Sequence, residues 1–147
     1  MDLHITAMSE REIAGIAELE KQCFSDPWSE TALKEELSNS SARFFAAIAG
    51  GEVVGYIGCI LVCGEGSITN VAVKKSARRM GVASRLLEAL INALKQEGAE
   101  SVFLEVRTSN EAAQKLYEKF GFAVCGKRRD FYKNPREDGY IMKLLLN

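Results

Sequence analysis

The chain has 147 residues, of which 47% are hydrophobic and 27% charged, with 19 Lys and Arg against 20 Asp and Glu. This length predicts a single domain over residues 1–147 with one well-buried core. The net charge of -1 argues against direct binding of nucleic acid or of an anionic membrane surface. No apolar run reaches the about 18 residues of a membrane span, and the N-terminus lacks a basic and apolar leader, so we expect a cytoplasmic protein.

The cysteines lie in apolar or helical surroundings and share no Cys-x-x-Cys spacing; they are Cys23, Cys59, Cys63 and Cys125. His4 is the single histidine, so we expect neither a zinc site nor a Cys–His nucleophile pair. We predict four buried free thiols, no disulfide and no bound metal.

Hydrophobic periodicity predicts a strand, two helices and three further strands in the first half of the chain. The first helix begins at the capping box Ser9-x-x-Glu12, and the second begins after Ser29, which follows the break at Asp26-Pro27. Gly50-Gly51 indicates a hairpin turn. The predicted strands are residues 3–7, 44–49, 53–62 and 67–73.

The second half alternates helices with strands. A stripe of apolar residues predicts a helix between Gly81 and Gly98, and alternation predicts a strand over 101–107. Another helix follows from about residue 109 to 120, and two final strands, 122–126 and 140–146, flank a polar, turn-rich loop. Hairpins followed by two helical crossovers predict an α/β fold, in which a central mixed β-sheet carries helices on both faces.

Residues 70–84 combine an apolar strand, a basic turn and a helix that begins with small residues. The first turn of a helix presents backbone N–H groups without helical partners, and small residues at Gly81 and Ala83 let a phosphate approach them. Arg78 and Arg79 add positive charge. The arrangement fits a diphosphate; the alternative is a basic surface loop in which Gly81 only turns the chain.

The spacing Arg78-x-x-Gly81-x-Ala83 resembles the pyrophosphate-binding signature of the GNAT family of acetyl-CoA-dependent N-acetyltransferases. Ala83 stands where many relatives carry glycine. The resemblance implies a single N-acetyltransferase domain with the GNAT acyl-CoA N-acyltransferase fold, acetyl-CoA as co-substrate and no metal.

Residues 104–110 (LEVRTSN), followed by Ala113, Leu116-Tyr117 and Gly121-Phe122, are similar to the downstream motif of the same family. The similarity is greatest to its RimI-type branch, the ribosomal-protein-alanine N-acetyltransferases. Residues 24–29 and 136–142 also look like this branch, so the resemblance spans nearly the whole chain.

The resemblance further implies direct attack of an amine on the acetyl thioester, with both substrates bound and no acyl-enzyme. Such a reaction needs a base, a group that polarises the carbonyl and an acid for the thiolate. Glu105 matches the base and Tyr117 the proton donor. From the residues alone, a solvated glutamate on a strand is the favoured interpretation of Glu105, and an aromatic core residue that of Tyr117.

The implied coenzyme contacts lie on the strand, the turn and the starts of two helices. The strand backbone would pair with the pantetheine arm and polarise the acetyl carbonyl. The matching residues are Val71, Ala72, Val73, Arg79, Met80, Gly81, Val82, Ala83, Ser84 and Asn110. The alternatives are a plain buried strand at residues 71–73 and a helix cap at Asn110.

Trp28 and Tyr132 are candidates for a peptide-substrate groove, although Trp28, after Pro27, also fits a hydrophobic plug. Phe131 stands where the branch implies the first residue of a Tyr-Tyr pair, so one hydroxyl is missing there.

The resemblance implies a protein N-terminal alanine N-alpha-acetyltransferase. Its acceptor would be the N-terminus of small-subunit ribosomal protein number eighteen, or of another protein, without a nucleic-acid or membrane partner; oligomeric state is not predicted. One alternative is acetylation of lysine side chains or a small amine, although lysine, with a pKa of about 10.4 against about 7.7–8.0 for an α-amine, needs stronger deprotonation. Another is a non-catalytic acyl-CoA sensor, and a nucleic-acid-binding module is a remote third.

Overall fold

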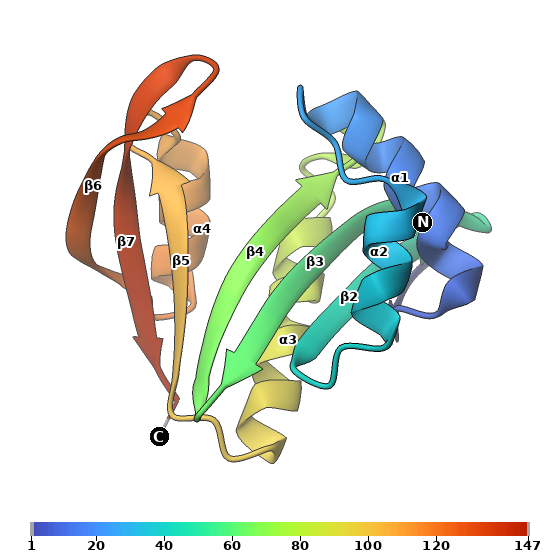
Figure 1. Cartoon of the computed structure of the whole chain (residues 1–147), viewed down its shortest axis with the longest axis horizontal. Helices are drawn as coiled ribbons and strands as arrows, with labels where there is room; N and C mark the ends of the chain where they lie inside the picture. Colours follow the sequence, from blue (N-terminus) through green and yellow to red (C-terminus); the bar gives the residue numbers. More distant parts are fainter. Residues whose placement is uncertain (1, 147) are drawn as a thin grey trace.

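The computed structural model describes residues 2–146, which form a seven-stranded mixed sheet and four α-helices in the predicted order (Figure 1). The elements are β1 (Leu3–Ala7), α1 (Glu10–Cys23), α2 (Glu30–Leu37), β2 (Ala42–Ala49), β3 (Glu52–Val62), β4 (Glu65–Val73), a 3-10 turn (Lys75–Ala77), α3 (Val82–Gln96), β5 (Ser101–Arg107), α4 (Glu111–Lys119), β6 (Ala123–Lys133) and β7 (Arg136–Leu145). The strands lie in the order β1-β2-β3-β4-β5-β7-β6. No helix within residues 2–146 is long and apolar enough to cross a membrane.

Helices cover both faces of the sheet, as predicted. In Figure 1, α1 and α2 lie on one side of the sheet and α3 and α4 on the other. The apolar stripe of α3 is fully buried at Leu86, Leu90 and Leu94 and packs in the larger of two cores. Ile16 of α1 and Leu33 of α2 belong to the second core, on the opposite face. The central strands of the sheet are therefore buried from both sides.

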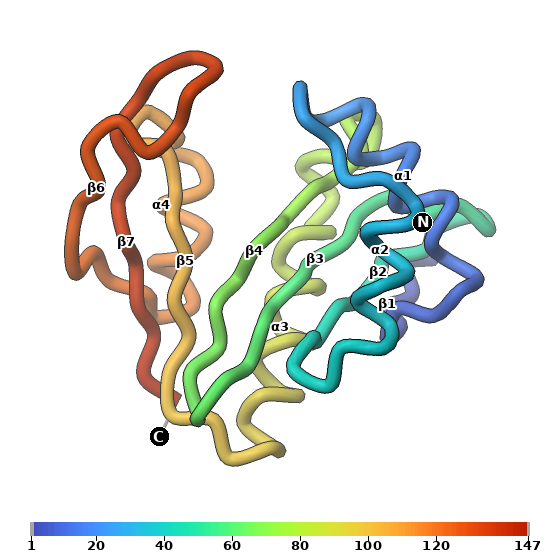
Figure 2. Tube along the Cα trace, viewed as in Figure 1, coloured from blue at the N-terminus to red at the C-terminus, as the bar shows by residue number. Residues whose placement is uncertain are grey.

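β4 and β5 form a parallel pair that holds only at one end. Residues 65–67 pair with 101–103, and beyond them the two strands diverge (Figures 1 and 2). The register of β3 and β4 shifts between the pairs Gly58–Asn70 and Cys59–Ile68, and such a bulge increases local twist. The diverging ends, residues 68–73 and 104–107, therefore face each other without a ladder of hydrogen bonds between them.

The last hairpin is longer than predicted. Residues 127–133 and 136–139 are strand, where a polar loop was expected, so that prediction is wrong. The β6–β7 register shifts in this region, and Asp130 has a φ of 50°. This irregularity and the exposure of the edge strand β6 remove the two-residue alternation by which a strand is recognised.

The predicted turns and caps are present. Gly50 and Gly51 have φ values of 58° and 78°, as a type I′ hairpin turn requires. The Glu12 carboxylate accepts the Ser9 backbone N–H at 2.7 Å at the start of α1. Ser29 caps α2 through its side chain.

The prediction of four buried thiols is wrong for most of them. Cys59 is buried, Cys23 is half-buried, and Cys63 and Cys125 are exposed, although all four are free. Cys63 lies in the turn after β3 and Cys125 on the edge strand β6, where an apolar sequence neighbourhood does not give burial. Within residues 2–146, no group of three or more His, Cys, Asp or Glu side chains is placed to hold a metal ion.

Candidate active site

A cavity of about 260 Å³, here called the inner cavity, lies where β4 and β5 separate. The diverging strand ends, the first turns of α4 and parts of α1–α2 and β6 surround it. Its lining residues are Phe24, Ile68, Thr69, Asn70, Val71, Leu104, Glu105, Val106, Arg107, Asn110, Ala113, Tyr117 and Tyr132. The residues predicted as base and acid therefore line one cavity.

Glu105 lies between two buried neighbours on β5. Leu104 and Val106 are 2% and 5% exposed, whereas Glu105 is half-buried, as the alternation of a strand requires. Its Oε2 lies 3.5 Å from Nε of Arg128 on β6, and the two side chains are 30% and 55% exposed respectively. Because water reaches this pair, it contributes little to stability, and the carboxylate can exchange Arg128 for a substrate cation.

Tyr117 reaches the inner cavity from α4. It is 8% exposed, and its ring contacts Phe122 at a centroid distance of 5.7 Å. Burial, with a smaller contribution from Tyr132, raises the pKa of Tyr117 to about 12. The phenol is therefore protonated at neutral pH and has a proton to donate inside the cavity.

The turn between β5 and α4 is held by two amide side chains. Asn110 is the N-cap of α4 and accepts the Ala113 backbone N–H at 3.1 Å, while it also lines the inner cavity. Nε2 of Gln114 donates to the carbonyl oxygens of Arg107 at 3.0 Å and Thr108 at 3.1 Å. The cap and a cavity role for Asn110 are thus compatible.

A larger cavity of about 560 Å³, here called the outer groove, adjoins the inner cavity. The two share Phe24, Thr69, Asn70 and Arg107. One wall of the outer groove is the α1–α2 connection, including Trp28, and another is the tip of the β6–β7 hairpin, residues 134–135. A chain lying in the outer groove could place its end in the inner cavity.

The α1–α2 wall is anchored by a buried carboxylate. Glu20 is 1% exposed, and its Oε1 accepts the Trp28 backbone N–H at 2.9 Å. Its Oε2 accepts the hydroxyl of Tyr56, on β3, at 2.5 Å. Burial, then the hydrogen bond to Glu20, raises the pKa of Tyr56 well above its ordinary value. Trp28 also packs on Phe44, with ring centroids 6.2 Å apart, so this wall is fixed to the sheet.

The basic turn ends in left-handed backbone before α3. Arg79 and Gly81 have φ values of 69° and 77°, and Gly81 is the N-cap of α3. The Arg85 N–H bonds to the Gly81 carbonyl at 3.0 Å, so the N–H groups of residues 82–84 are those that a helix leaves without helical partners. The first turn of α3 holds no acidic residue and Gly81 offers no capping side chain, so these donors remain available to an anion.

The structure brings together only part of the predicted site. Val71, Glu105, Asn110, Tyr117 and Tyr132 line the inner cavity, and Trp28 lines the outer groove. Ala72 is buried at 4% against the α1 side of the sheet. Val73, Arg79, Met80, Gly81, Val82, Ala83 and Ser84 lie outside both cavities, at the end of β4 and the start of α3.

Four residues without a predicted role also belong to the site. Phe24, Asn70 and Arg107 line the inner cavity, and Arg128 pairs with Glu105. Within the described residues, Oδ1 of Asn70 is buried without a hydrogen-bond partner, a state that costs about 1–3 kcal/mol. Arg107 stands inside the motif of residues 104–110, and Asn70 begins the segment of residues 70–84 that contains the basic turn; these positions were the available signal. Arg128 lies in the segment that was expected to be a loop.

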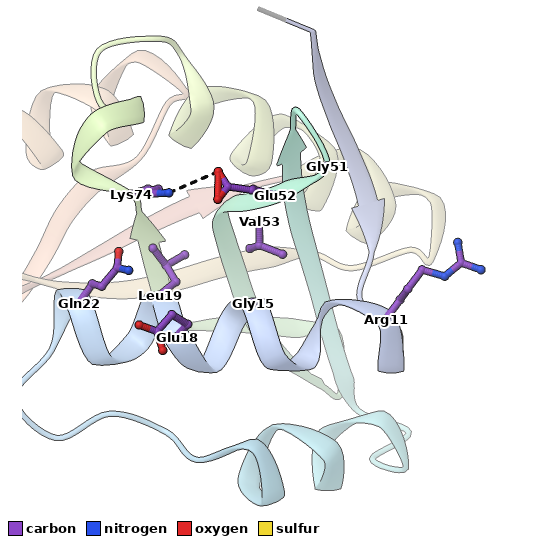
Figure 3. A pocket seen from close by; sticks show the side chains of 9 residues that line it. All are labelled: Arg11, Gly15, Glu18, Leu19, Gln22, Gly51, Glu52, Val53 and Lys74. Atoms are coloured by element: carbon purple, nitrogen blue, oxygen red, sulfur yellow. Dashed lines mark ion pairs between the residues drawn. The ribbon is translucent and has the colours of Figure 1, made fainter.

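A further cavity of about 310 Å³ lies between α1 and the β2–β3 turn (Figure 3). Lys74 pairs there with Glu52 at 3.5 Å. Arg11 and Lys74 oppose Glu18 and Glu52 in charge, so the cavity favours no class of ligand. None of the residues predicted for the site lines it.

Comparisons with known proteins identify the family of the chain. Residues 13–122 match the family model described as the acetyltransferase (GNAT) family. The ribosomal protein bS18-alanine N-acetyltransferase of Escherichia coli (strain K12) is 33% identical over 144 residues, which cover 95% of each chain.

Two solved structures are also similar along the whole chain. The crystal structure of the ribosomal-protein-S18-alanine N-acetyltransferase from Escherichia coli has a TM-score of 0.90 at 30% identity and covers 99% of this chain and 95% of that one. The crystal structure of the NatC complex bound to Gag peptide and CoA includes a chain with a TM-score of 0.86 at 25% identity, with 100% of both chains covered. The chain belongs to the GNAT family of acetyltransferases, as its motifs predicted.

Proposed function

We propose that this chain is a protein N-terminal N-alpha-acetyltransferase, which moves acetyl from acetyl-CoA to the N-terminal alanine of small-subunit ribosomal protein bS18. The observation that carries the proposal is that a carboxylate, Glu105, and a neutral phenol, Tyr117, line one cavity at the separation of β4 and β5. The name of the similar Escherichia coli enzyme supports the choice of acceptor.

Glu105 removes the proton of the acceptor. At pH 7, deprotonating an α-ammonium with a pKa of about 7.7–8.0 costs about 1 kcal/mol, whereas a lysine ammonium at about 10.4 costs about 4.6 kcal/mol. A carboxylate that acts directly or through a water suffices for the first. The incoming ammonium takes the place that Arg128 holds beside Glu105 in the free enzyme.

The neutral amine then attacks the acetyl carbon, the N–C bond forms, the C–S bond breaks, and the nitrogen loses its second proton to water as the neutral amide forms. The departing sulfur takes up negative charge, and Tyr117 donates a hydrogen bond to it. The pKa of Tyr117 is about 12. Because a thiol has a pKa of about 8.5, full proton transfer from the phenol is uphill. Tyr117 therefore acts mainly by stabilising the developing thiolate.

Acetyl-CoA is held from β4 to the start of α3. Residues 71–73 lie on the β4 edge that β5 does not pair, so their backbone can reach the pantetheine amides and the acetyl carbonyl, although the Val73 carbonyl oxygen accepts from Nε of Arg78 at 3.3 Å. The free N–H groups of residues 82–84 and the Arg79 side chain suit the pyrophosphate. CoA in the similar NatC complex supports acetyl-CoA as the co-substrate.

The acceptor protein lies in the outer groove. Its first residue enters the inner cavity between Phe24 and Arg107, and the following residues pass between Trp28 and the tip of the β6–β7 hairpin. A free end is required because this entry is bounded by the α1–α2 connection on one side and the hairpin on the other. This geometry supports α-amines over side chains within a folded surface.

The test is acetylation of a peptide panel with mapping of the product by mass spectrometry. Two peptides share one sequence that contains an internal lysine. The first begins with a free alanine, and in its matched control the N-terminus is blocked. We expect one acetyl group on the α-amine of the first peptide and none on the control. Labelling confined to internal lysines would contradict the proposal, and acetyl-CoA binding without turnover on any peptide would favour the sensor alternative.

A further inference from the structure

Arg107 ends β5 two positions after Glu105 and lines both the inner cavity and the outer groove. Its guanidinium group reaches across to the β6–β7 hairpin. Nη1 donates to the carbonyl oxygen of Pro135 at 2.9 Å and to Oε1 of Glu137 at 3.1 Å. Nη2 donates to the carbonyl oxygen of Asn134 at 3.3 Å. One side chain thus holds both residues of the hairpin tip.

The same guanidinium lies over the ring of Tyr132, with its central carbon 4.3 Å from the ring centroid. The planar fork of arginine makes these edge hydrogen bonds and the face contact at once, which a lysine ammonium cannot do. The side chain of Arg107 is 28% exposed, so the contacts are partly shielded from water.

Glu137 bonds the β6–β7 hairpin to the turn between β5 and α4. Its Oε2 accepts the Ser109 backbone N–H at 2.7 Å and the Thr108 hydroxyl at 3.2 Å, while Oε1 accepts from Arg107. Hydrogen bonds from Ser109, Arg107 and Thr108 hold the pKa of Glu137 at about 2. The carboxylate therefore stays charged across the working pH range and bonds the hairpin to the segment between Glu105 and α4.

We propose that Arg107 is a positioning residue for the acceptor, which with Glu137 fixes the hairpin tip as a wall of the outer groove; this rests on the proposed function. Asn134 and Pro135 line that groove. The strand pairs Lys133–Arg136 and Tyr132–Glu137 keep the hairpin closed without help from Arg107. Loss of Arg107 therefore releases the placement of the tip against β5 and leaves the hairpin itself intact.

The test compares Arg107→Gln, Arg107→Lys and a matched control, Arg43→Gln. Arg43 is 27% exposed and pairs with Glu97 through two contacts of 2.7 Å. Arg43 also donates to the backbone oxygens of Ser40 at 2.6 Å and Ala42 at 2.9 Å. It resembles Arg107 in its partners and exposure but lines neither the inner cavity nor the outer groove.

Two readouts are measured on the purified full chain: the KM values for the alanine peptide and for acetyl-CoA, and hydrogen exchange of residues 130–138. We expect Arg107→Gln to raise the peptide KM by about tenfold, to leave the acetyl-CoA KM within about twofold and to speed exchange at the hairpin tip. Arg107→Lys should fall between Arg107→Gln and wild type, and Arg43→Gln should match wild type in both readouts.

An unchanged peptide KM and unchanged exchange in Arg107→Gln would overturn the inference. So would equal rises of both KM values, because a general loss of structure does not distinguish the two substrates. If Arg107→Gln does not fold, Arg107→Lys carries the same comparison. If wild type acetylates no alanine peptide, the proposed function fails, and exchange at the tip still decides whether Arg107 positions it.

Discussion

Removal of the Tyr56 hydroxyl tests whether the wall of the outer groove is anchored from the core. Tyr56 is 0% exposed, and its hydroxyl donates to Oε2 of Glu20 at 2.5 Å. In Tyr56→Phe the ring keeps its stack on Phe44, whose centroid lies 6.2 Å away, so the substitution removes little packing. What it leaves is one oxygen of a 1% exposed carboxylate without its donor.

The expected loss of stability follows from the Glu20 oxygen that no longer accepts a hydrogen bond. A hydrogen bond to a charged group contributes about 1.5–3 kcal/mol, and the loss of a donor to a buried acceptor lies at the upper end, so we expect about 3 kcal/mol. For a chain of this size, about 1 kcal/mol shifts the unfolding midpoint by about 2–4 °C. Tyr56→Phe should therefore lower the midpoint by about 6–12 °C.

Thermal unfolding followed by circular dichroism measures this shift, and Tyr117→Phe is the matched control. Tyr117 is also buried, at 8%, but no hydrogen bond contributes to its raised pKa, so loss of its hydroxyl should leave the midpoint within about 2 °C. A shift in Tyr56→Phe no larger than that of the control would refute the anchoring role of Glu20. In a double-mutant cycle, Tyr56→Phe with Glu20→Gln should show a coupling of at least about 1 kcal/mol.

Three further predictions concern the remaining parts of the site. Tyr117→Phe should lower kcat by about 10²-fold or more without loss of stability, measured with the alanine peptide; a kcat within about threefold of wild type would remove Tyr117 from the chemistry. Gly81→Ala should raise the KM for acetyl-CoA. Gly98, at the other end of α3, is the matched control, because it has a nearly equal φ of 78° and equally open space where a side-chain methyl group would lie. Gly98→Ala should therefore cost similar stability and leave the KM for acetyl-CoA unchanged. Equal KM values in the two variants would contradict a coenzyme contact at Gly81. The pKa of Glu137, about 2, lies below the ordinary value of about 4.3, so its stabilisation is present above pH 4.3 and is lost as the pH falls toward 2. Glu137→Gln should therefore reduce the fall in unfolding midpoint between about pH 6 and about pH 3, and an unchanged fall would contradict the hydrogen bonds assigned to its carboxylate.

The sequence predicts elements well where periodicity is strong. The apolar stripe of α3 from Val82 to Leu94 is buried as expected, and burial alternates along β5 as expected. The β6–β7 hairpin was missed over residues 127–139, because a bulge and an exposed edge remove the alternation that marks a strand. Exposure of Cys63 and Cys125 has the same origin: the local sequence is apolar, but a turn and an edge strand leave both in contact with water.

The site was predictable where a motif reports a backbone geometry or a family position. Glu105 and Tyr117 were proposed in this way, and they line one cavity. Arg128 and the Glu20–Tyr56 pair were not found, because their contacts join segments 23 and 36 positions apart and depend on how strands and helices pack. The sequence around a charged residue or a tyrosine does not indicate a partner that lies so far away along the chain.

The transfer rate of Glu105→Gln as a function of pH tests the central claim most directly, namely that Glu105 takes the proton of the acceptor α-amine. With the alanine peptide, we expect the variant to lose about 10²-fold at pH 7 relative to wild type. Because the α-amine deprotonates unaided above about pH 8, the deficit should shrink to within about tenfold near pH 9.5. A folded variant whose rate stays within about threefold of wild type at pH 7, or whose deficit does not change with pH, would contradict the assignment.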